Sequence, residues 1–276
     1  DPYELVRSGK WTFDKLCELC RKVSKDLDGD GQLTEKDQYG ITYNNFAWQI
    51  LYYGINEPFI KKDKDGELYF DSKNEKIINY LQKMLPSAQD DTVTLYSENY
   101  SKLGGNYRID VCTNAFNEGR AMFWLEAMYG VPSLRDMGND FGILPTPKYD
   151  EKQENYISFV SQHICGLMSV PKTNSDLERT GIILEALAME SSDTVIPAYY
   201  DVTLKNKLLR DDDSVKMLDI IFGNRKLDSG EVFDFGGWSL KYIEVCATDK
   251  YPVASTYESY KSAIKGDIES FMQKLS

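Results

Sequence analysis

The residues with the clearest chemical role form a twelve-residue acidic segment, 26–37, with the sequence Asp-Leu-Asp-Gly-Asp-Gly-Gln-Leu-Thr-Glu-Lys-Asp. Carboxylates occupy its positions 1, 3, 5 and 12, and Gly31 occupies position 6. A hard cation such as Ca2+ takes roughly six or more oxygen ligands, and alternate short side chains on a tight loop point toward one centre. Gly31 permits the positive φ that turns the next carbonyl toward that centre. We predict a calcium site with the ligands Asp26, Asp28, Asp30, Gln32 and Asp37.

Two features of this acidic loop indicate a structural ion rather than a calcium sensor. Position 12 is Asp, one methylene shorter than the usual Glu, so the loop must close more tightly around the ion. Residues 38–43 alternate and include Gly40, which predicts a strand instead of the exit helix of a sensor. A solvated acidic turn without metal is the alternative, but the register of Gly31 with all four acids favours the metal. A second acidic turn, 63–66, lacks the remaining ligands and is predicted to be a hairpin turn.

A helix must deliver the chain into the acidic loop. Thr12 can cap a helix over 13–23, in which apolar residues recur at helical spacing. Cys17 and Cys20 have the spacing of a redox motif or half a zinc site, but both fall on the apolar face of this helix. We therefore interpret them as small core residues.

Helices alternate with short strands along the rest of the chain, which predicts the α/β class. The predicted helices cover 75–85, the segment from the Ser175 and Glu178 capping box to about 190, 211–223, and a long final segment after the Ser255 and Glu258 capping box. The predicted strands cover 121–124, 140–147 and 156–170.

The composition is that of a globular protein that does not bind nucleic acid. The 276 residues carry 44 acidic and 32 basic side chains, and the net charge of -12 leaves no basic surface for phosphates. No apolar run is long enough to span a bilayer, because the best candidate, 121–134, is interrupted by Glu126, Gly130 and Pro132. The chain begins at Asp1 rather than at Met, and we expect it to be a processed or truncated product.

A stretch that mixes amides with an aromatic ring follows the strand predicted after the loop. It contains Asn44, Asn45 and Trp48. An indole ring stacks on the C–H face of a sugar, and amides hydrogen-bond the hydroxyls at its rim. This stretch therefore suits a ligand with hydroxyls on its rim and C–H groups on its faces.

Three motifs, taken in order, resemble family 1 extracellular solute-binding proteins, the sugar-capturing lipoproteins of ABC importers related to maltose-binding protein. The motifs are the acidic loop ending in Asp37-Gln38-Tyr39-Gly40, Phe116-x-x-Gly119-Arg120-Ala121-Met122, and Phe141-Gly142-Ile143-Leu144-Pro145-x-Pro147. The resemblance covers nearly the whole chain. It implies a periplasmic-binding-protein-like (type II) α/β fold, in which two lobes bind a sugar in the cleft between them.

The resemblance also implies that most of the amino-terminal lobe is missing from this chain. Residues 1–160, with the acidic loop at 26–37, and residues 210–276 are then expected to form the carboxy-terminal lobe. Residues 161–209 are expected to belong to the amino-terminal lobe. A protein without half of its cleft is expected to bind sugar weakly or not at all.

Six site residues are implied by the resemblance together with the amide stretch. Each tryptophan among them has an ordinary core position as its alternative, and we expect two of the three to lie in the cleft. Arg108 and Arg120 have the chemistry to recognise an acidic sugar, but pairing with local acids is favoured in so acidic a chain. The expected sugar-binding residues are Asn44, Asn45, Trp48, Trp124, Glu126 and Trp238.

The leading hypothesis is a non-enzymatic carbohydrate-binding component of an ABC importer with one structural Ca2+. The expected partners are a mono- or oligosaccharide and the membrane subunits of the importer, and the expected location is the surface of a bacterium, as a lipoprotein. The alternative is a calcium-dependent glycoside hydrolase or polysaccharide-processing enzyme, since paired carboxylates and aromatic rings also suit that chemistry. No spacing in the sequence singles out an acid and a nucleophile. A calcium sensor is disfavoured by the single loop with a strand behind it.

Overall fold

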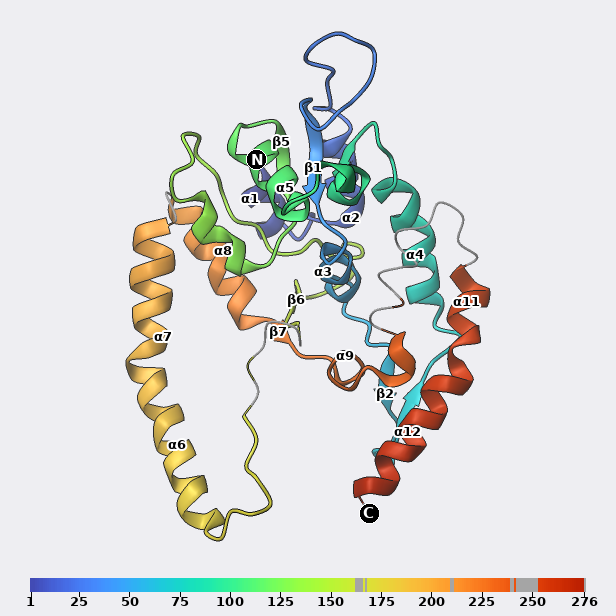
Figure 1. Cartoon of the computed structure of the whole chain (residues 1–276), viewed down its shortest axis with the longest axis vertical. Helices are drawn as coiled ribbons and strands as arrows, with labels where there is room; N and C mark the ends of the chain where they lie inside the picture. Colours follow the sequence, from blue (N-terminus) through green and yellow to red (C-terminus); the bar gives the residue numbers. More distant parts are fainter. Residues whose placement is uncertain (162–165, 167, 209–210, 239–240, 242–252, 276) are drawn as a thin grey trace.

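A parallel three-stranded sheet forms the centre of the structure (Figure 1). The computed structural model describes residues 1–161, 166, 168–208, 211–238, 241 and 253–275. Within these ranges, residues 48, 203, 205–208 and 275 are described by their backbone alone. Strand β1 (Tyr39–Tyr43) lies between β4 (Thr94–Tyr96) and β5 (Ala121–Trp124) and pairs in parallel with both. All residues of β1 are buried, as expected for a central parallel strand. The strand predicted after the acidic loop is therefore confirmed.

Helical crossovers join the parallel strands, as parallel pairing requires. The connection from β1 to β4 contains α3 (Ala47–Gly54), the antiparallel hairpin of β2 (Ile60–Lys62) and β3 (Leu68–Phe70), and α4 (Glu75–Ala88). The connection from β4 to β5 contains η1 (Ser97–Leu103) and α5 (Tyr107–Asn117). In the hairpin, Asp63 Oδ1 accepts hydrogen bonds from the backbone N–H groups of Asp65 and Glu67. The α/β class and the hairpin turn at 63–66 are both confirmed.

Helix α2 (Phe13–Cys20) packs against β1 and leads toward the acidic loop. The hydroxyl of Thr12 accepts a hydrogen bond from the Lys15 N–H at 3.3 Å, so the predicted cap is confirmed. A Cβ at Gly40 would lie 2.3 Å from the Cβ of Cys20, and the two elements approach this closely only because Gly40 has no side chain. Cys17 and Cys20 are free thiols, and burial raises the pKa of Cys20 to about 12. The interpretation of these cysteines as core residues is confirmed.

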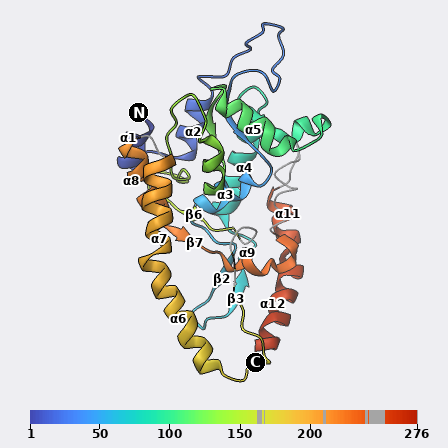
Figure 2. The ribbon, with the colours of Figure 1, turned by 60° about the vertical axis from the view of Figure 1, so that its left-hand side comes forward.

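A cluster of aromatic rings joins the hairpin to the carboxy-terminal helices. Strand β3 of the hairpin lies beside α12 (Figure 2). These helices are α9 (Ser229–Phe233), η4 (Phe235–Gly237), α11 (Val253–Ser259) and α12 (Lys261–Leu275). Trp238 is 1% exposed at the centre of the cluster. Its ring centroid lies 5.1 Å from that of Tyr260 and 5.3 Å from that of Tyr257, and the rings of Phe59 and Phe70 lie at 6.2 and 6.4 Å.

The chain leaves the sheet region and returns to it through a short parallel pair, β6 (Ser158–Phe159) and β7 (Arg225–Lys226). Between them lie α6 (Leu177–Asp193), α7 (Val195–Pro197), the π-helical η3 (Ala198–Leu208) and α8 (Asp212–Gly223). Helices α6 and α7 run along one side of the molecule, away from the sheet (Figure 1). No helix within the described ranges is long and apolar enough to cross a membrane.

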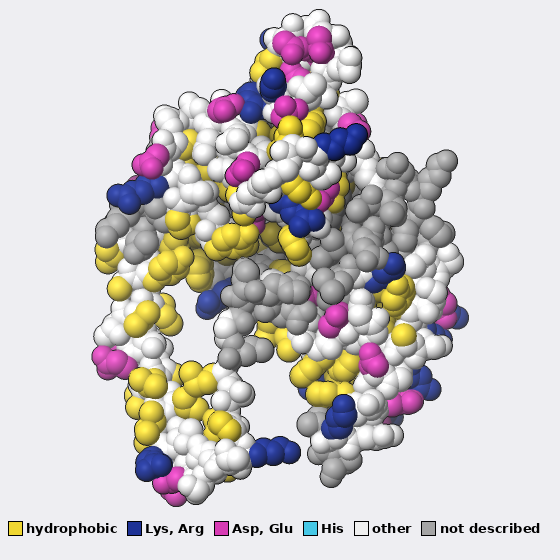
Figure 3. All heavy atoms as spheres, in the orientation of Figure 1, with side chains coloured by type: hydrophobic (Ala, Val, Ile, Leu, Met, Phe, Trp, Pro, Cys, Tyr) yellow, Lys and Arg dark blue, Asp and Glu magenta, His cyan; other side chains and the backbone are white. Residues whose placement is uncertain are grey.

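Helix α6 has no buried residue and carries a row of exposed hydrophobic side chains. Figure 3 shows hydrophobic side chains gathered along this arm. Leu177, Ile182, Ile183, Leu187 and Met189 are each more than half exposed, between 51% and 66%. The other end of the segment is anchored, because Leu204 of η3 packs with Leu218 of α8 in a buried cluster.

Several predicted boundaries are wrong. Helix α4 continues through Pro86 to Ala88, because burial of Leu85 and Ala88 holds its last turn in place. The cap of α6 is Asp176, whose carboxylate accepts a hydrogen bond from the Arg179 N–H at 3.0 Å, rather than Ser175. The long final helix is divided into α11 and α12 at residue 260. Residues 140–147 form no strand, and the strand predicted over 156–170 is limited, among the described residues, to 158–159.

Candidate functional site

The carboxyl ends of two neighbouring strands bring a predicted amide and a predicted acid together. Asn44 follows β1 directly, and Glu126 comes two residues after β5. Asn44 Nδ2 donates a hydrogen bond to Glu126 Oε2 at 3.2 Å, while Asn44 Oδ1 accepts one from the Phe46 N–H at 2.9 Å. The carboxyl edge of a parallel sheet is the usual place for a ligand in an α/β protein. The structure therefore places two of the predicted sugar-binding residues in one site.

Glu126 is held in a fixed orientation at this site. Its Oε1 accepts a hydrogen bond from the Ala127 N–H at 2.8 Å. Burial raises the pKa of Glu126, although the hydrogen bonds from Ala127, Asn44 and Tyr129 oppose the rise. Gly130 of η2 (Met128–Leu134) lies against this side chain, because a Cβ there would be 2.7 Å from Glu126 Cγ. A carboxyl group fixed in this way is suited to hydrogen-bonding a ligand hydroxyl.

A cavity of about 480 Å³ opens beside Glu126. Its volume lies within the usual range for a small-molecule site, roughly 300–1,000 Å³. Its wall is largely apolar and contains exposed aromatic side chains, with Phe46 at 48% and Tyr129 at 57% exposure. The chemically informative lining residues are Phe46, Gln49, Glu126, Tyr129, Phe159, Phe222 and Arg225.

The three predicted tryptophans do not gather in this cavity. Trp238 is a core residue, so its prediction as a sugar-binding residue is wrong: four surrounding rings leave its indole no exposed face. Trp124 is half-buried and is not among the cavity-lining residues, and its ring centroid lies 5.8 Å from that of Phe116 with the two rings tilted by 43°. The side chain of Trp48 lies outside the described part of the structure. Asn45 is half-buried outside the cavity wall, and its Oδ1 has no hydrogen-bond partner among the described residues.

Sequence reasoning missed the aromatic residues that line the cavity. Phe46 lies within the predicted amide stretch, and Tyr129 follows Glu126 by three residues. Their proximity to the predicted strand ends is the feature of the sequence that indicates a place in the cavity wall. Phe159 and Phe222 come from the segments around β6 and β7, whose pairing joins residues far apart in the sequence.

A second buried acid lies behind the cavity wall. Glu231 is fully buried, and its Oε2 accepts a hydrogen bond from the Tyr53 hydroxyl at 3.2 Å. Burial, with a smaller contribution from the nearby charges of Asp234 and Asp228, raises the pKa of Glu231 to about 7. The Tyr53 ring stacks on Phe159 of the cavity wall at 4.2 Å between centroids. The acid therefore supports the wall from behind.

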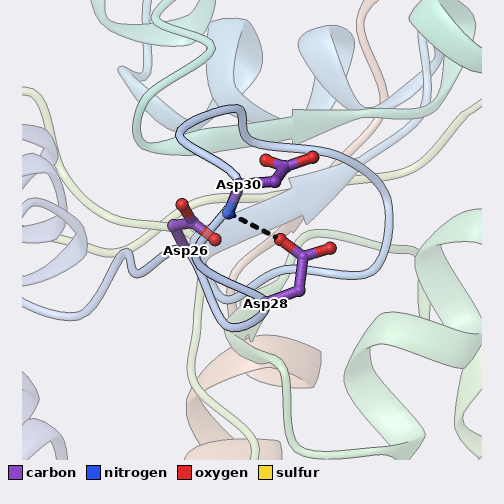
Figure 4. Close-up of side chains that lie close together, drawn as sticks. All are labelled: Asp26, Asp28 and Asp30. Atoms are coloured by element: carbon purple, nitrogen blue, oxygen red, sulfur yellow. Dashed lines mark hydrogen bonds between the residues drawn. The ribbon is translucent and has the colours of Figure 1, made fainter.

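The acidic loop brings three of its four aspartates together. Asp26, Asp28 and Asp30 each offer a carboxylate oxygen within 4.8 Å of the other two (Figure 4). Asp26 accepts hydrogen bonds from the Gly29 and Gly31 N–H groups at 2.7 and 2.8 Å, and these bonds lower its pKa. Gly31 has a φ of +84°, as the sharp turn requires. Charged carboxylates on a wound loop are the donor set that a hard divalent cation prefers.

Asp37 closes the loop from inside. It is 1% exposed, and its carboxylate accepts hydrogen bonds from the Leu27 N–H at 2.8 Å and the Thr34 N–H at 2.7 Å. These backbone hydrogen bonds lower the pKa of Asp37. Its carboxylate is not part of the three-aspartate group. Its hydrogen bonds instead hold the two ends of the loop together. Gln32 donates its N–H to Asp30 Oδ1 at 2.7 Å, which fixes the peptide next to the group.

Two solved sugar-binding proteins have the same fold as this chain. The maltotriose binding protein of Thermus thermophilus, solved with maltotriose, superposes with a TM-score of 0.57 at 15% identity, over 93% of this chain and 66% of that protein. The maltose/maltodextrin-binding domain MalE of Bdellovibrio bacteriovorus, bound to maltotriose, superposes with a TM-score of 0.54 at 17% identity, over 95% of this chain and 67% of that protein. No family model and no curated protein sequence matches. The expected periplasmic-binding-protein-like fold is confirmed, and the chain spans about two thirds of the length of these structures.

Proposed function

We propose that this chain, which has the fold of maltose- and maltotriose-binding proteins, is the extracytoplasmic carbohydrate-binding component of an ABC importer and not an enzyme. The observation that carries the proposal is the cavity at the carboxyl edge of the sheet, where the Asn44 and Glu126 pair meets exposed aromatic rings. Its ligand is a mono- or oligosaccharide. Its further partners are the membrane subunits of the importer, and its location is the surface of a bacterium, where a lipid anchor holds it.

The cavity wall offers both of the contacts that a sugar needs. The exposed rings of Phe46 and Tyr129 provide flat apolar faces for sugar C–H groups. The carboxyl of Glu126 provides an acceptor for hydroxyl groups. A few convergent polar groups within an apolar wall are typical of a small-molecule site.

The opposite wall of the cleft comes, in this proposal, from a lobe that the chain does not contain. Residues 1–160 and 210–276 belong to the carboxy-terminal lobe, and residues 161–209 belong to the amino-terminal lobe. The exposed apolar side chains of α6 support this division, because soluble proteins rarely leave large apolar patches uncovered. The anchoring of Leu204 against α8 explains how the segment stays attached to the rest of the chain.

Substitution of Glu126 by Gln is expected to weaken saccharide binding about tenfold or more, since a hydrogen bond to a charged group is lost. The binding of maltotriose and other oligosaccharides to the 276-residue chain is measured by saturation-transfer NMR, which detects weak complexes. Glu151→Gln is the matched control, because Glu151 is exposed on a distant turn. If Glu126→Gln and wild type bound saccharide equally, Glu126 would not be a saccharide-binding residue. Absence of binding to every saccharide, or turnover of a chromogenic glycoside, would contradict the proposed function.

We also propose one structural Ca2+ in the acidic loop. Asp26, Asp28 and Asp30 supply carboxylate oxygens, and the Gln32 carbonyl and Asp37 are the remaining candidate ligands. The ion would neutralise repulsion within the group and fix the connection between α2 and β1. It would supply no chemistry to the sugar site, which is formed by other residues.

Calcium at about 100 times its dissociation constant is expected to stabilise the chain by about 2.7 kcal/mol. Addition of a chelator is therefore expected to lower the thermal midpoint by several degrees, roughly 2–4 °C per kcal/mol for a chain of this size. Asp28→Ala is expected to abolish the difference between calcium and chelator in differential scanning calorimetry. Asp65→Ala in the hairpin turn is the control and should retain it. An unchanged wild-type midpoint in chelator would exclude the site.

A further inference from the structure

Arg225 projects a positive charge into the cavity from β7. It is exposed and lines the cavity wall. Its Nε donates a hydrogen bond to the Phe222 carbonyl oxygen at 2.9 Å, and its guanidinium carbon lies 5.1 Å from the centre of the Phe222 ring. The side chain is therefore held at two points, which leaves the paired terminal nitrogens of the guanidinium for a ligand. Among the described residues, no carboxylate forms an ion pair with Arg225.

Several other arginines among the described residues form ion pairs with acids. Arg108 pairs with Glu98 and Arg120 pairs with Glu118, as the sequence predicted for both. Arg7 contacts Asp213 at 3.0 Å. A chain with 44 acidic residues offers partners readily, so an arginine that faces a cavity without one is suited to an anion from outside.

The cavity wall thus carries two chemically different polar groups. The carboxyl of Glu126 is already hydrogen-bonded to Asn44 and to the Ala127 N–H, and it suits a hydroxyl donor. Arg225 offers two parallel N–H donors, which match the two oxygens of a carboxylate. The aromatic rings of the same wall suit the sugar body.

We propose that the ligand is an acidic saccharide, whose uronate carboxylate binds Arg225 while its hydroxyls bind at Glu126. This inference rests on the proposed function and narrows its substrate class. Neutral sugars use the same aromatic faces but leave the guanidinium unpaired. A charge-assisted bidentate contact is expected to favour the uronate about 10- to 100-fold.

The test compares maltotriose, trigalacturonate and a sulfated trisaccharide by saturation-transfer NMR and calorimetry. Wild type is expected to prefer trigalacturonate, and the preference should fall as salt rises from about 20 to about 300 mM. Arg225→Gln is expected to abolish the preference, so that trigalacturonate and maltotriose bind with similar affinity. Arg179→Gln, which alters an exposed arginine paired with Asp176 on α6, is the matched control.

The possible outcomes separate this inference from the proposed function. Binding of maltotriose with no preference for trigalacturonate would overturn the inference and leave the proposed function standing. Equal or tighter binding of the sulfated trisaccharide would overturn the assignment of a carboxylate. Failure to bind any of the three saccharides would overturn both.

Discussion

Replacement of Trp238 by Ala is expected to lower the free energy of unfolding by about 3–5 kcal/mol, the usual range for a buried aromatic residue. The indole is 1% exposed and lies within 6.4 Å of the rings of Phe59, Phe70, Tyr257 and Tyr260, measured between centroids. Its removal leaves a cavity between the hairpin and the carboxy-terminal helices. Guanidinium denaturation followed by far-UV circular dichroism measures the loss.

Phe46→Ala provides the contrasting control for Trp238. Phe46 is 48% exposed and lines the cavity, so its removal is expected to change stability by less than about 1 kcal/mol and to weaken saccharide binding. If Trp238→Ala instead kept the stability of wild type and lost saccharide binding, Trp238 would belong to the cleft as the sequence suggested.

Replacement of Gly40 by Ala is expected to cost about 3 kcal/mol, at the upper end of ordinary overpacking. The new Cβ would lie 2.3 Å from Cys20 Cβ, 2.4 Å from its Cα and 2.6 Å from its carbonyl oxygen. Two of these atoms are backbone, so no rotamer change relieves the clash and α2 must move away from β1. Because α2 leads into the acidic loop, the response of stability to calcium is expected to weaken as well. Chemical denaturation with and without calcium measures both effects.

Gly181→Ala is the control for Gly40→Ala. Gly181 lies within α6 and has no heavy atom within 4 Å of a Cβ position. Alanine there is expected to stabilise the chain by about 0.5–1 kcal/mol through helix propensity alone. A Gly40→Ala variant as stable as wild type would mean that α2 does not pack on β1 at this distance.

Local patterns predicted what local interactions determine. The spacing of aspartates and glycines in the acidic loop predicted a shared centre, and the structure brings Asp26, Asp28 and Asp30 within 4.8 Å. Thr12 was predicted as a helix cap because its hydroxyl needs only an N–H three residues ahead. The alternation around Gly40 likewise predicted β1 from its own residues.

The residues of the candidate site could be predicted only in part, because their meeting depends on which strands are neighbours in the sheet. Asn44 and Glu126 were each expected in the site, but their contact depends on the order β4-β1-β5, which places the ends of β1 and β5 side by side. The sequence around Trp238 contains no signal that its ring faces Phe59 and Phe70 instead of a cleft. The residues around Arg225 do not indicate its position beside the cavity, because that position follows from the pairing of β7 with β6.

The exposed apolar side chains of α6 are expected to promote self-association of the isolated chain. Hydrophobic side chains spaced along a solvent-facing helix attract one another between molecules, because their contact releases ordered water. At millimolar protein this attraction competes with the mutual repulsion that a net charge of -12 provides, and salt weakens the repulsion. Helix α6 is thus expected to be the part of this chain that limits its solubility.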